Sequence, residues 1–189
     1  MGYPSSIVAR EEDMTRVVVG LAGKSGSGKS TVAAALQMRF GFARVSFGDR
    51  VRYVAHQRTL PSDRGSLDVL GRALIDELGW DQFCESVLAG TELAARVVVD
   101  GIRHVAAQTT IRKLVAPARF GMAFVEIDEA VRLRHLSLRG RSGDTGSVFE
   151  MNDDMEQLRR EAEIIVDGAS STAADVIEAW VKSLSANDH

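Results

Sequence analysis

Residues 16–31 read RVVVGLAGKSGSGKST, and the interpretation of the whole chain starts from this stretch. Gly23 is followed by four other residues and then by Gly28, Lys29 and Ser30, which gives the phosphate-binding pattern G-x-x-x-x-G-K-[ST]. An apolar, β-branched run precedes the pattern, and an alanine-rich run with helical spacing follows it. A glycine-rich turn without function would need no such flanks. The order therefore predicts a strand, a phosphate-binding loop and a helix.

The residue types in this loop are those that a bound triphosphate requires. Glycines let backbone N–H groups close around an anion, and the following helix points its positive dipole end at the same place. Lys29 is expected to reach the β- and γ-phosphates, and the Ser30 hydroxyl to bind Mg²⁺. The predicted cofactors are therefore ATP and Mg²⁺. The predicted nucleotide-binding residues are Gly23, Ser25, Gly26, Ser27, Gly28, Lys29, Ser30 and Thr31.

The composition fits one ordinary globular domain. Of the 189 residues, 45% are hydrophobic and 26% are charged, which is enough to bury a core without disulfides or structural metals. We expect a flexible arm over residues 1–14 and a single domain over residues 15–189. The net charge of −3 argues against broad nucleic-acid binding.

Cysteine usage and hydropathy predict where the protein works. Cys84 is the single cysteine of the sequence, and a chain that cannot form an internal disulfide suits a reducing cytoplasm. The sequence has no run of eighteen apolar residues and no signal-peptide pattern at its start. We therefore expect a cytoplasmic protein that does not bind membranes and is a monomer or a homodimer.

Apolar runs alternate with helical repeats along the chain. After the first strand at 17–19, further strands are expected at 42–47, 96–100, 122–127 and 164–166. Helices are expected at 29–40, from 48, twice within 63–88 with a break at Gly79, and at 104–114, 129–138, 149–161 and from 172. Strands that alternate with helices form right-handed β-α-β units. The predicted fold class is therefore α/β, with a five-stranded parallel sheet between two helical layers.

Some apolar side chains already have expected places in this fold. In the last helix, Val176, Ile177, Trp180 and Leu184 are predicted to point inward. In the helical stretch between the second and third strands, the larger apolar residues are expected either in the core or in the wall of a binding pocket. These residues are Leu67, Leu74, Trp80 and Phe83.

Two polar clusters follow predicted strands. Asp49 and Arg52 come just after the second strand, and Asp100 and Arg103 directly after the third. Ligands bind at the carboxyl ends of open parallel sheets, so Asp49 and Arg52 are candidates to orient an acceptor, whereas Asp100 is a candidate Mg²⁺ ligand. The alternatives are an aspartate that caps its own helix at Asp49 and a solvated strand end at Asp100.

A third cluster surrounds a glycine-rich stretch. Arg132, Arg139 and Arg141 are basic, and residues 139–146 read RGRSGDTG, which is typical of a mobile loop. Guanidinium groups fit phosphate oxygens in two-bond geometry. A loop that closes here would bring cations to a transferred phosphoryl group. A solvated basic helix is the alternative.

Taken together, the segments GKSGSGKST, SFGDRVR, VVVDGIR and LRGRSGD resemble the nucleoside monophosphate kinase group of phosphate-loop kinases. Within that group the chain is most similar to phage-type deoxynucleoside monophosphate kinases and to archaeal proteins described as dephospho-CoA-kinase-like. The resemblance covers roughly residues 16–180. It implies the three-layer fold of phosphate-loop NTPases, a helical acceptor-binding insertion at about 49–90 and a short lid at about 139–147.

The resemblance also implies roles for residues that match its motifs. It places Asp49, Arg52 and Arg103 at the acceptor, and Arg139 and Arg141 in the lid, so that with Lys29 these form the catalytic set. The implied reaction is Mg²⁺-dependent transfer of a phosphoryl group from ATP to a nucleoside or deoxynucleoside monophosphate. Two alternatives stay open: a kinase of a hydroxyl acceptor such as dephospho-CoA, for which Asp49 could be the base, and a regulatory ATPase without a small acceptor.

Overall fold

The computed structural model of the protein describes residues 16–138 and 153–186. Its strands are β1 (Val17–Ala22), β2 (Ala43–Ser46), β3 (Arg96–Ile102), β4 (Arg119–Glu126) and β5 (Ile164–Asp167). Its helices are α1 (Lys29–Phe40), α2 (Phe47–Gln57), α3 (Arg64–Leu88), α4 (Val105–Val115), α5 (Glu129–Leu138), α6 (Asp153–Glu161) and α7 (Ala173–Ala186). No helix within the described ranges is both long and apolar enough to cross a membrane.

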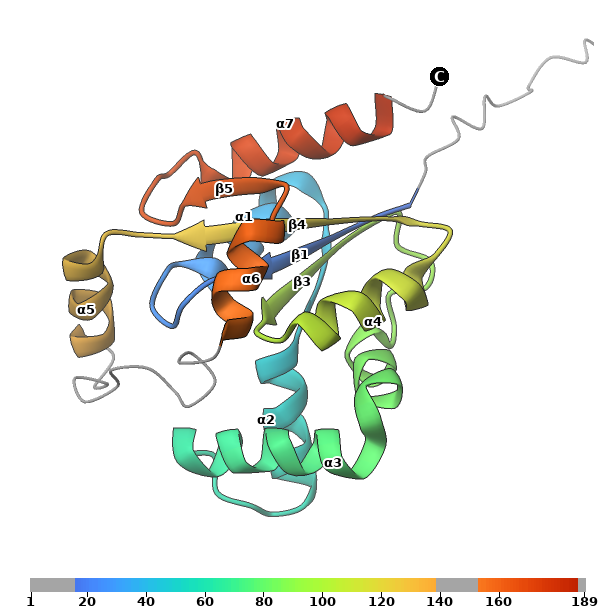
Figure 1. Cartoon of the computed structure of the whole chain (residues 1–189), viewed down its shortest axis with the longest axis vertical. Coiled ribbons are helices and arrows are strands. Elements are labelled where there is room, and N and C mark those ends of the chain that lie inside the picture. Colours follow the sequence, from blue (N-terminus) through green and yellow to red (C-terminus); the bar gives the residue numbers. More distant parts are fainter. Residues whose placement is uncertain (1–15, 139–152, 187–189) are drawn as a thin grey trace, which may run out of the picture.

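The strands form one parallel sheet in the order β2-β3-β1-β4-β5 (Figure 1). The central strand β1 pairs with β3 on one side and with β4 on the other. Because all strands run in the same direction, their carboxyl ends share one edge, and this edge carries the loop that precedes α1. The predicted α/β class with a five-stranded parallel sheet is confirmed.

Two helical layers bury the two faces of the sheet. In β1, Val17 and Val19 belong to a core that includes α1 and α7, whereas Val18 and Ala22 belong to a core that includes α2, α3, α4 and α6. Both faces of the strand are therefore buried, as its unbroken apolar sequence predicts. In α7 the buried stripe contains Ile177 at 0% exposure, while Val176 is 45% exposed, so the prediction that Val176 points inward is wrong.

Strand β3 is longer than its apolar run. It extends to Ile102, and its register with β1 shifts at one point, because Leu21 is opposite Asp100 while Ala22 is opposite Ile102. The skipped residue is Gly101, whose φ of 90° lies in a region that glycine occupies without strain. The shift comes directly after Asp100, which is still paired with Leu21 on one side and with Ser46 on the other.

The segment between β2 and β3 forms a helical insertion that projects from the sheet, at the bottom of Figure 1. Ser46 begins α2, because its Oγ accepts a hydrogen bond from Asp49 N at 3.2 Å. Asp63 begins α3 in the same way, through Ser66 N at 3.1 Å. The break that the sequence predicts in α3 is present: Gly79 has φ 70° and ψ 170° inside an otherwise helical run.

Candidate active site

The phosphate-binding pattern forms the loop between β1 and α1. Gly23, Gly26 and Gly28 have φ angles of 141°, 81° and 95°, a backbone region that residues with a side chain rarely adopt. Space forbids a side chain as well, because a Cβ on Gly23 would lie 2.1 Å from the carbonyl oxygen of Val125. The loop conformation therefore depends on these glycines.

The turn after β5 touches the same loop without any side chain in between. A Cβ on Gly168 would lie 1.7 Å from the carbonyl oxygen of Ser27. A Cβ on Gly28, the N-cap of α1, would lie 2.6 Å from the carbonyl oxygen of Gly168. Direct backbone contact thus fixes the N-terminus of α1 relative to the end of β5.

Lys29 lies against the backbone of the loop. Its Nζ donates hydrogen bonds to the carbonyl oxygens of Gly23 at 2.6 Å and Lys24 at 2.7 Å, and the residue is only 8% exposed. Ser30 and Thr31 follow in the first turn of α1, and both are exposed. The ammonium group and the two hydroxyls are thus carried by the same helix N-terminus.

Helix α5 supports the loop from another side. Arg132 Nη1 donates to the carbonyl oxygen of Ser25 at 3.0 Å, and His135 Nδ1 donates to that of Gly26 at 3.2 Å. The other nitrogens of Arg132 bind the Glu129 carboxylate at 2.7 and 2.9 Å, which lowers the pKa of Glu129. Arg132 is 4% exposed, so the alternative of a solvated basic residue is wrong at this position. It braces the loop backbone.

Asp100 lies at the carboxyl end of β3, beside the loop. It is 3% exposed, which excludes the alternative of a solvated strand end. Arg44 on β2 donates to its Oδ2 at 2.9 Å. Hydroxyl and carboxylate oxygens are the ligands that Mg²⁺ prefers, so Ser30 and Asp100 fit the ion by their chemistry. Within residues 16–138 and 153–186, no group of three or more His, Cys, Asp or Glu could hold a metal by itself.

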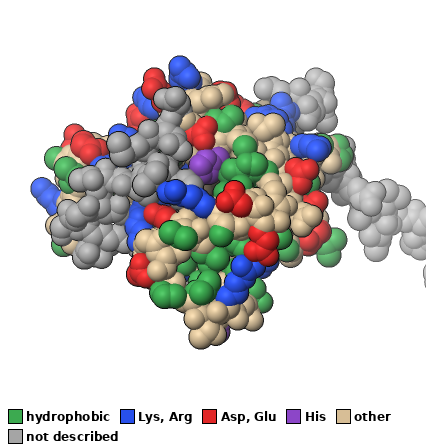
Figure 2. All heavy atoms as spheres, turned by 60° about the horizontal axis from the view of Figure 1, so that its bottom comes forward, with side chains coloured by type: hydrophobic (Ala, Val, Ile, Leu, Met, Phe, Trp, Pro, Cys, Tyr) green, Lys and Arg blue, Asp and Glu red, His purple; other side chains and the backbone are tan. Residues whose placement is uncertain are grey.

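A cavity of about 600 Å³ opens between the loop and the helical insertion. On the side of the sheet it is lined by Ser25, Lys29, Ser30 and Asp100. The residues that are predicted to bind phosphate and those that are predicted to bind Mg²⁺ therefore share one wall of the cavity. Figure 2 shows the face on the side of α2 and α3, where hydrophobic side chains gather among acidic and basic ones. The cavity size is typical of small-molecule sites.

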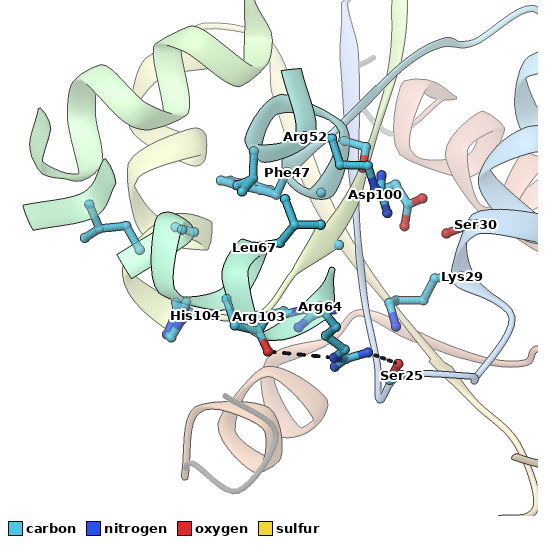
Figure 3. Close-up of a pocket in the computed structure, with 18 of the residues that line it drawn as sticks. Ser25, Lys29, Ser30, Phe47, Arg52, Arg64, Leu67, Asp100, Arg103 and His104 are labelled. Atoms are coloured by element: carbon cyan, nitrogen blue, oxygen red, sulfur yellow. Dashed lines mark hydrogen bonds and ion pairs between the residues drawn. The ribbon is translucent and has the colours of Figure 1, made fainter. Parts of the chain in front are cut away.

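Arginines from three elements reach this cavity (Figure 3): Arg52 on α2, Arg64 on α3 and Arg103 after β3. Arg64 Nη1 donates to Ser25 Oγ at 2.9 Å. Asp49 does not line the cavity; its carboxylate, 62% exposed, binds Arg52 Nη1 at the surface. Because Ser46 caps α2, the alternative that Asp49 caps its own helix is also wrong.

The far wall of the cavity is apolar and partly aromatic. Phe47 and Phe83 meet edge to face with ring centroids 5.6 Å apart, and Trp80 lies 5.2 Å from the ring of His104. His104 Nδ1 in turn lies 2.9 Å from Asp154 Oδ2 on α6. Of the apolar residues singled out in the sequence, three line the cavity, and they are Leu67, Trp80 and Phe83. Leu74 is core, at 2% exposure.

A second cavity of about 850 Å³ lies at the ends of β4 and β5. Its two arginines are paired: Arg159 Nε donates to Glu126 Oε2 at 2.8 Å, and Arg132 binds Glu129. Ser27 also lines it, and the Ser27 hydroxyl is buried without a hydrogen-bond partner among the described residues. The phosphate loop thus separates two cavities.

Some predicted residues remain untested, and some residues of the site were not predicted from the sequence. Arg139, Arg141 and the lid at 139–147 lie outside the described residues, as does the arm at 1–14. Arg44, Arg64 and Gly168 were not predicted, since none belongs to a motif. A faint signal existed for Arg64 alone, because it follows the capping residue of a helix in the predicted acceptor region.

Comparison with solved structures identifies the fold. The chain is similar to shikimate kinase from Aquifex aeolicus, with a TM-score of 0.57 and 16% identity, covering 90% of this chain and 99% of that chain. It is also similar to the APS kinase CysC of Mycobacterium tuberculosis, with a TM-score of 0.56 and 17% identity, covering 90% of this chain and 98% of that chain. These likenesses show that the chain has the fold of phosphate-loop kinases.

Two comparisons at the level of sequence agree with this fold. A curated relative, the UPF0200 protein of Aeropyrum pernix, is 30% identical over 139 residues, which are 73% of each chain. The sequence model of a family described as AAA domain matches residues 22–150, which include the phosphate loop from Gly23 and the whole helical insertion. This match spans more than half of the chain, and the protein therefore belongs to the AAA domain family.

Proposed function

We propose that the protein transfers the terminal phosphoryl group of Mg²⁺-bound ATP to the phosphate of a nucleoside or deoxynucleoside monophosphate. The observation that carries the proposal is a single cavity that joins the phosphate loop to three arginines and an aromatic wall. The arginines suit an anionic group of a ligand, and the aromatic wall suits a planar apolar group next to it.

Each side chain has a role that its position supports. Lys29 and the N-terminus of α1 bind the donor phosphates, and the second cavity offers room for the donor's nucleoside. Ser30 and Asp100 are the proposed Mg²⁺ ligands; the bound ion would neutralise charge on the β- and γ-phosphates. Arg52 and Arg103 hold the acceptor phosphate, with Asp49 orienting Arg52.

The chemistry asks for positioning more than for a base. An oxygen of the acceptor phosphate attacks the γ-phosphorus, the bond from that phosphorus to the bridging oxygen breaks, and ADP leaves with the electron pair. Because the acceptor oxygen is already anionic, the arginines need only to align it and to stabilise charge in the transition state. Arg139 and Arg141 would add cations from the lid, as the sequence predicts.

The test is ADP release from Mg²⁺-ATP in the presence of a panel of ribo- and deoxynucleoside monophosphates, with dephospho-CoA as a hydroxyl acceptor. Lys29→Ala is the blank. We expect one class of nucleoside monophosphate to stimulate release at least tenfold. Stimulation by dephospho-CoA alone would establish the hydroxyl-acceptor alternative instead. If no acceptor of the panel stimulated ADP release although ATP still bound, the result would favour the regulatory ATPase.

A further inference from the structure

Arg64 joins the helical insertion to the phosphate loop. It is the first residue of α3, and the turn that carries it is fixed by Asp63, whose two carboxylate oxygens accept from Ser66 N at 3.1 Å and Ser66 Oγ at 2.6 Å. From there its Nη1 reaches Ser25 Oγ at 2.9 Å, across 39 residues of sequence (Figure 3).

The contact between Arg64 and Ser25 lies where the phosphoryl donor and the phosphoryl acceptor of the proposed reaction must meet. Arg64, Ser25 and Lys29 line the same cavity. Figure 3 shows the side chain of Arg64 between the loop, with Lys29, and the residues that follow β3. A phosphoryl group that moves from the loop into the cavity must face α3, because the acceptor lies on that side. The terminal phosphate of the donor is therefore the one nearest to Arg64.

The present partner of Arg64 on the loop is a weak one. Ser25 Oγ is a neutral acceptor, and hydrogen bonds from a guanidinium to an anionic oxygen are roughly twice as strong as those between neutral groups. A planar guanidinium also matches two phosphate oxygens at once. A phosphate in the loop therefore competes successfully with the serine hydroxyl for Arg64.

We propose that Arg64 binds the terminal phosphate of the nucleoside triphosphate donor and exchanges its contact with Ser25 for that phosphate. The exchange ties the helical insertion to the loaded loop, so that the acceptor-binding helices respond to whether the donor still carries its third phosphate. This inference rests on the proposed function in taking a nucleoside triphosphate as the donor and in placing the acceptor on the side of α3; it does not depend on which acceptor is bound.

The test compares two nucleotides in calorimetric titrations with Mg²⁺: the β,γ-imido analogue of ATP, which is not hydrolysed, and ADP. For Arg64→Gln we expect the dissociation constant of the analogue to rise about tenfold or more and that of ADP to change less than twofold. Arg64→Lys keeps the charge but not the two-bond geometry, so an intermediate loss is expected. Equal losses for both nucleotides, or none, would overturn the proposal.

A matched control comes from the same insertion. Arg58 follows α2 and binds Glu77 on α3 at 3.0 Å, away from the cavity and at the surface. Arg58→Gln therefore removes one positive charge from the insertion without touching the loop. We expect it to leave both dissociation constants within twofold of the wild type. If the affinity of this variant for the analogue fell tenfold, the effect of Arg64→Gln would be explained by the loss of net positive charge, and the proposal would be contradicted.

Ser25→Ala separates phosphate binding from a merely structural latch. This variant removes the hydroxyl that Arg64 binds on the loop, keeps the ion pair of Arg64 Nε with Asp68 Oδ2 at 3.7 Å and leaves the guanidinium available for the donor. Because Ser25 is also a predicted nucleotide-binding residue, a loss of affinity shared by both nucleotides is compatible with the proposal, which predicts that the ratio of their two dissociation constants stays within twofold of that of the wild type. If Ser25→Ala instead reproduced the selective loss of Arg64→Gln, the contact itself would be the function and the proposal would fail. Neither outcome depends on the acceptor panel, so the two proposals fail separately.

Discussion

Lys29 is held by carbonyl oxygens of the loop that it serves, and its removal tests the loop directly. In the proposed function the ammonium group supplies charge at the donor phosphates; in the structure its contacts are to loop carbonyls, Gly23 O and Lys24 O. We expect Lys29→Ala to lower turnover at least 100-fold, because a preorganised cation in such a site contributes several kcal/mol to transition-state stabilisation. Far-UV circular dichroism should match the wild type. Retained turnover would remove the loop from the mechanism.

Gly168 is a residue whose importance only the structure reveals. A Cβ there would lie 1.7 Å from the carbonyl oxygen of Ser27, so Gly168→Ala must push the turn after β5 away from the loop. We expect a loss of about 1–3 kcal/mol in the free energy of unfolding and weaker nucleotide binding, measured by urea denaturation and calorimetry. Gly65→Ala is the control, since its Cβ would meet only Asp63 Oδ1 at 3.5 Å.

The single cysteine is expected to be inert. Burial, with a smaller contribution from the charge of Asp81, raises the pKa of the Cys84 thiol from 9.0 to about 12. The native thiol therefore stays protonated between these values, while the unfolded thiol ionises, so this group lowers the free energy of unfolding as pH rises from 9 to 12. At pH 8 a disulfide reagent should label Cys84 only after urea is added. Rapid labelling of the native protein would contradict the buried position.

At the scale of elements, the bend in α3 places part of the cavity wall that is proposed to bind the acceptor. Gly79 has φ 70° and ψ 170°, and Trp80 comes next and lines the cavity. Gly79→Ala should cost about 1–3 kcal/mol of stability, because this backbone region is almost closed to residues with a Cβ. Since Trp80 would move with the backbone, we also expect the acceptor KM to rise while the ATP KM stays unchanged.

The control for the bend is another glycine with positive φ. Gly41 ends α1 with φ 72° and ψ 24° and lies before β2, outside the insertion. Gly41→Ala should lower the free energy of unfolding by about 1–2 kcal/mol and should change neither the acceptor KM nor the ATP KM. If it raised the acceptor KM as Gly79→Ala does, the effect would come from stability and not from the position of Trp80.

Helix α5 shows where helical spacing stops being informative. The sequence correctly places this helix at Glu129–Leu138, but helical spacing does not say what the face that carries Arg132 meets. Arg132 binds the carbonyl oxygen of Ser25 and the carboxylate of Glu129, because α5 packs against the loop rather than against solvent. A residue can thus serve a phosphate site by holding its backbone.

For the whole molecule, ligand binding should be visible as stability. A nucleotide that binds the folded chain alone stabilises it by about 2.7 kcal/mol at a concentration of 100 times its dissociation constant. For a chain of this size that corresponds to roughly 5–10 °C in Tm. We expect this shift with Mg²⁺-ATP in differential scanning calorimetry and a much smaller one for Lys29→Ala. Equal shifts in both proteins would place the nucleotide elsewhere.

The fold was predictable because its signals are local. Apolar β-branched runs mark β1 and β3, and a glycine-rich loop joins β1 to α1, so the parallel sheet follows from the order of elements. The cavity was not predictable in the same way. Arg44, Arg64 and Gly168 meet Asp100, Ser25 and Ser27 only through the tertiary structure. Long-range contacts of this kind leave no spacing in the sequence.

The support of the phosphate loop has a thermodynamic consequence. Arg132 and His135 hold two of its carbonyl oxygens, Gly168 touches its backbone, and Arg64 binds one of its hydroxyls. Fixing a residue of free chain costs about 1–2 kcal/mol of conformational entropy, and in this loop folding has already met that cost. Binding of an anion therefore orders little further chain, although Arg64 exchanges its loop contact for the phosphate, and binding should be favoured by enthalpy.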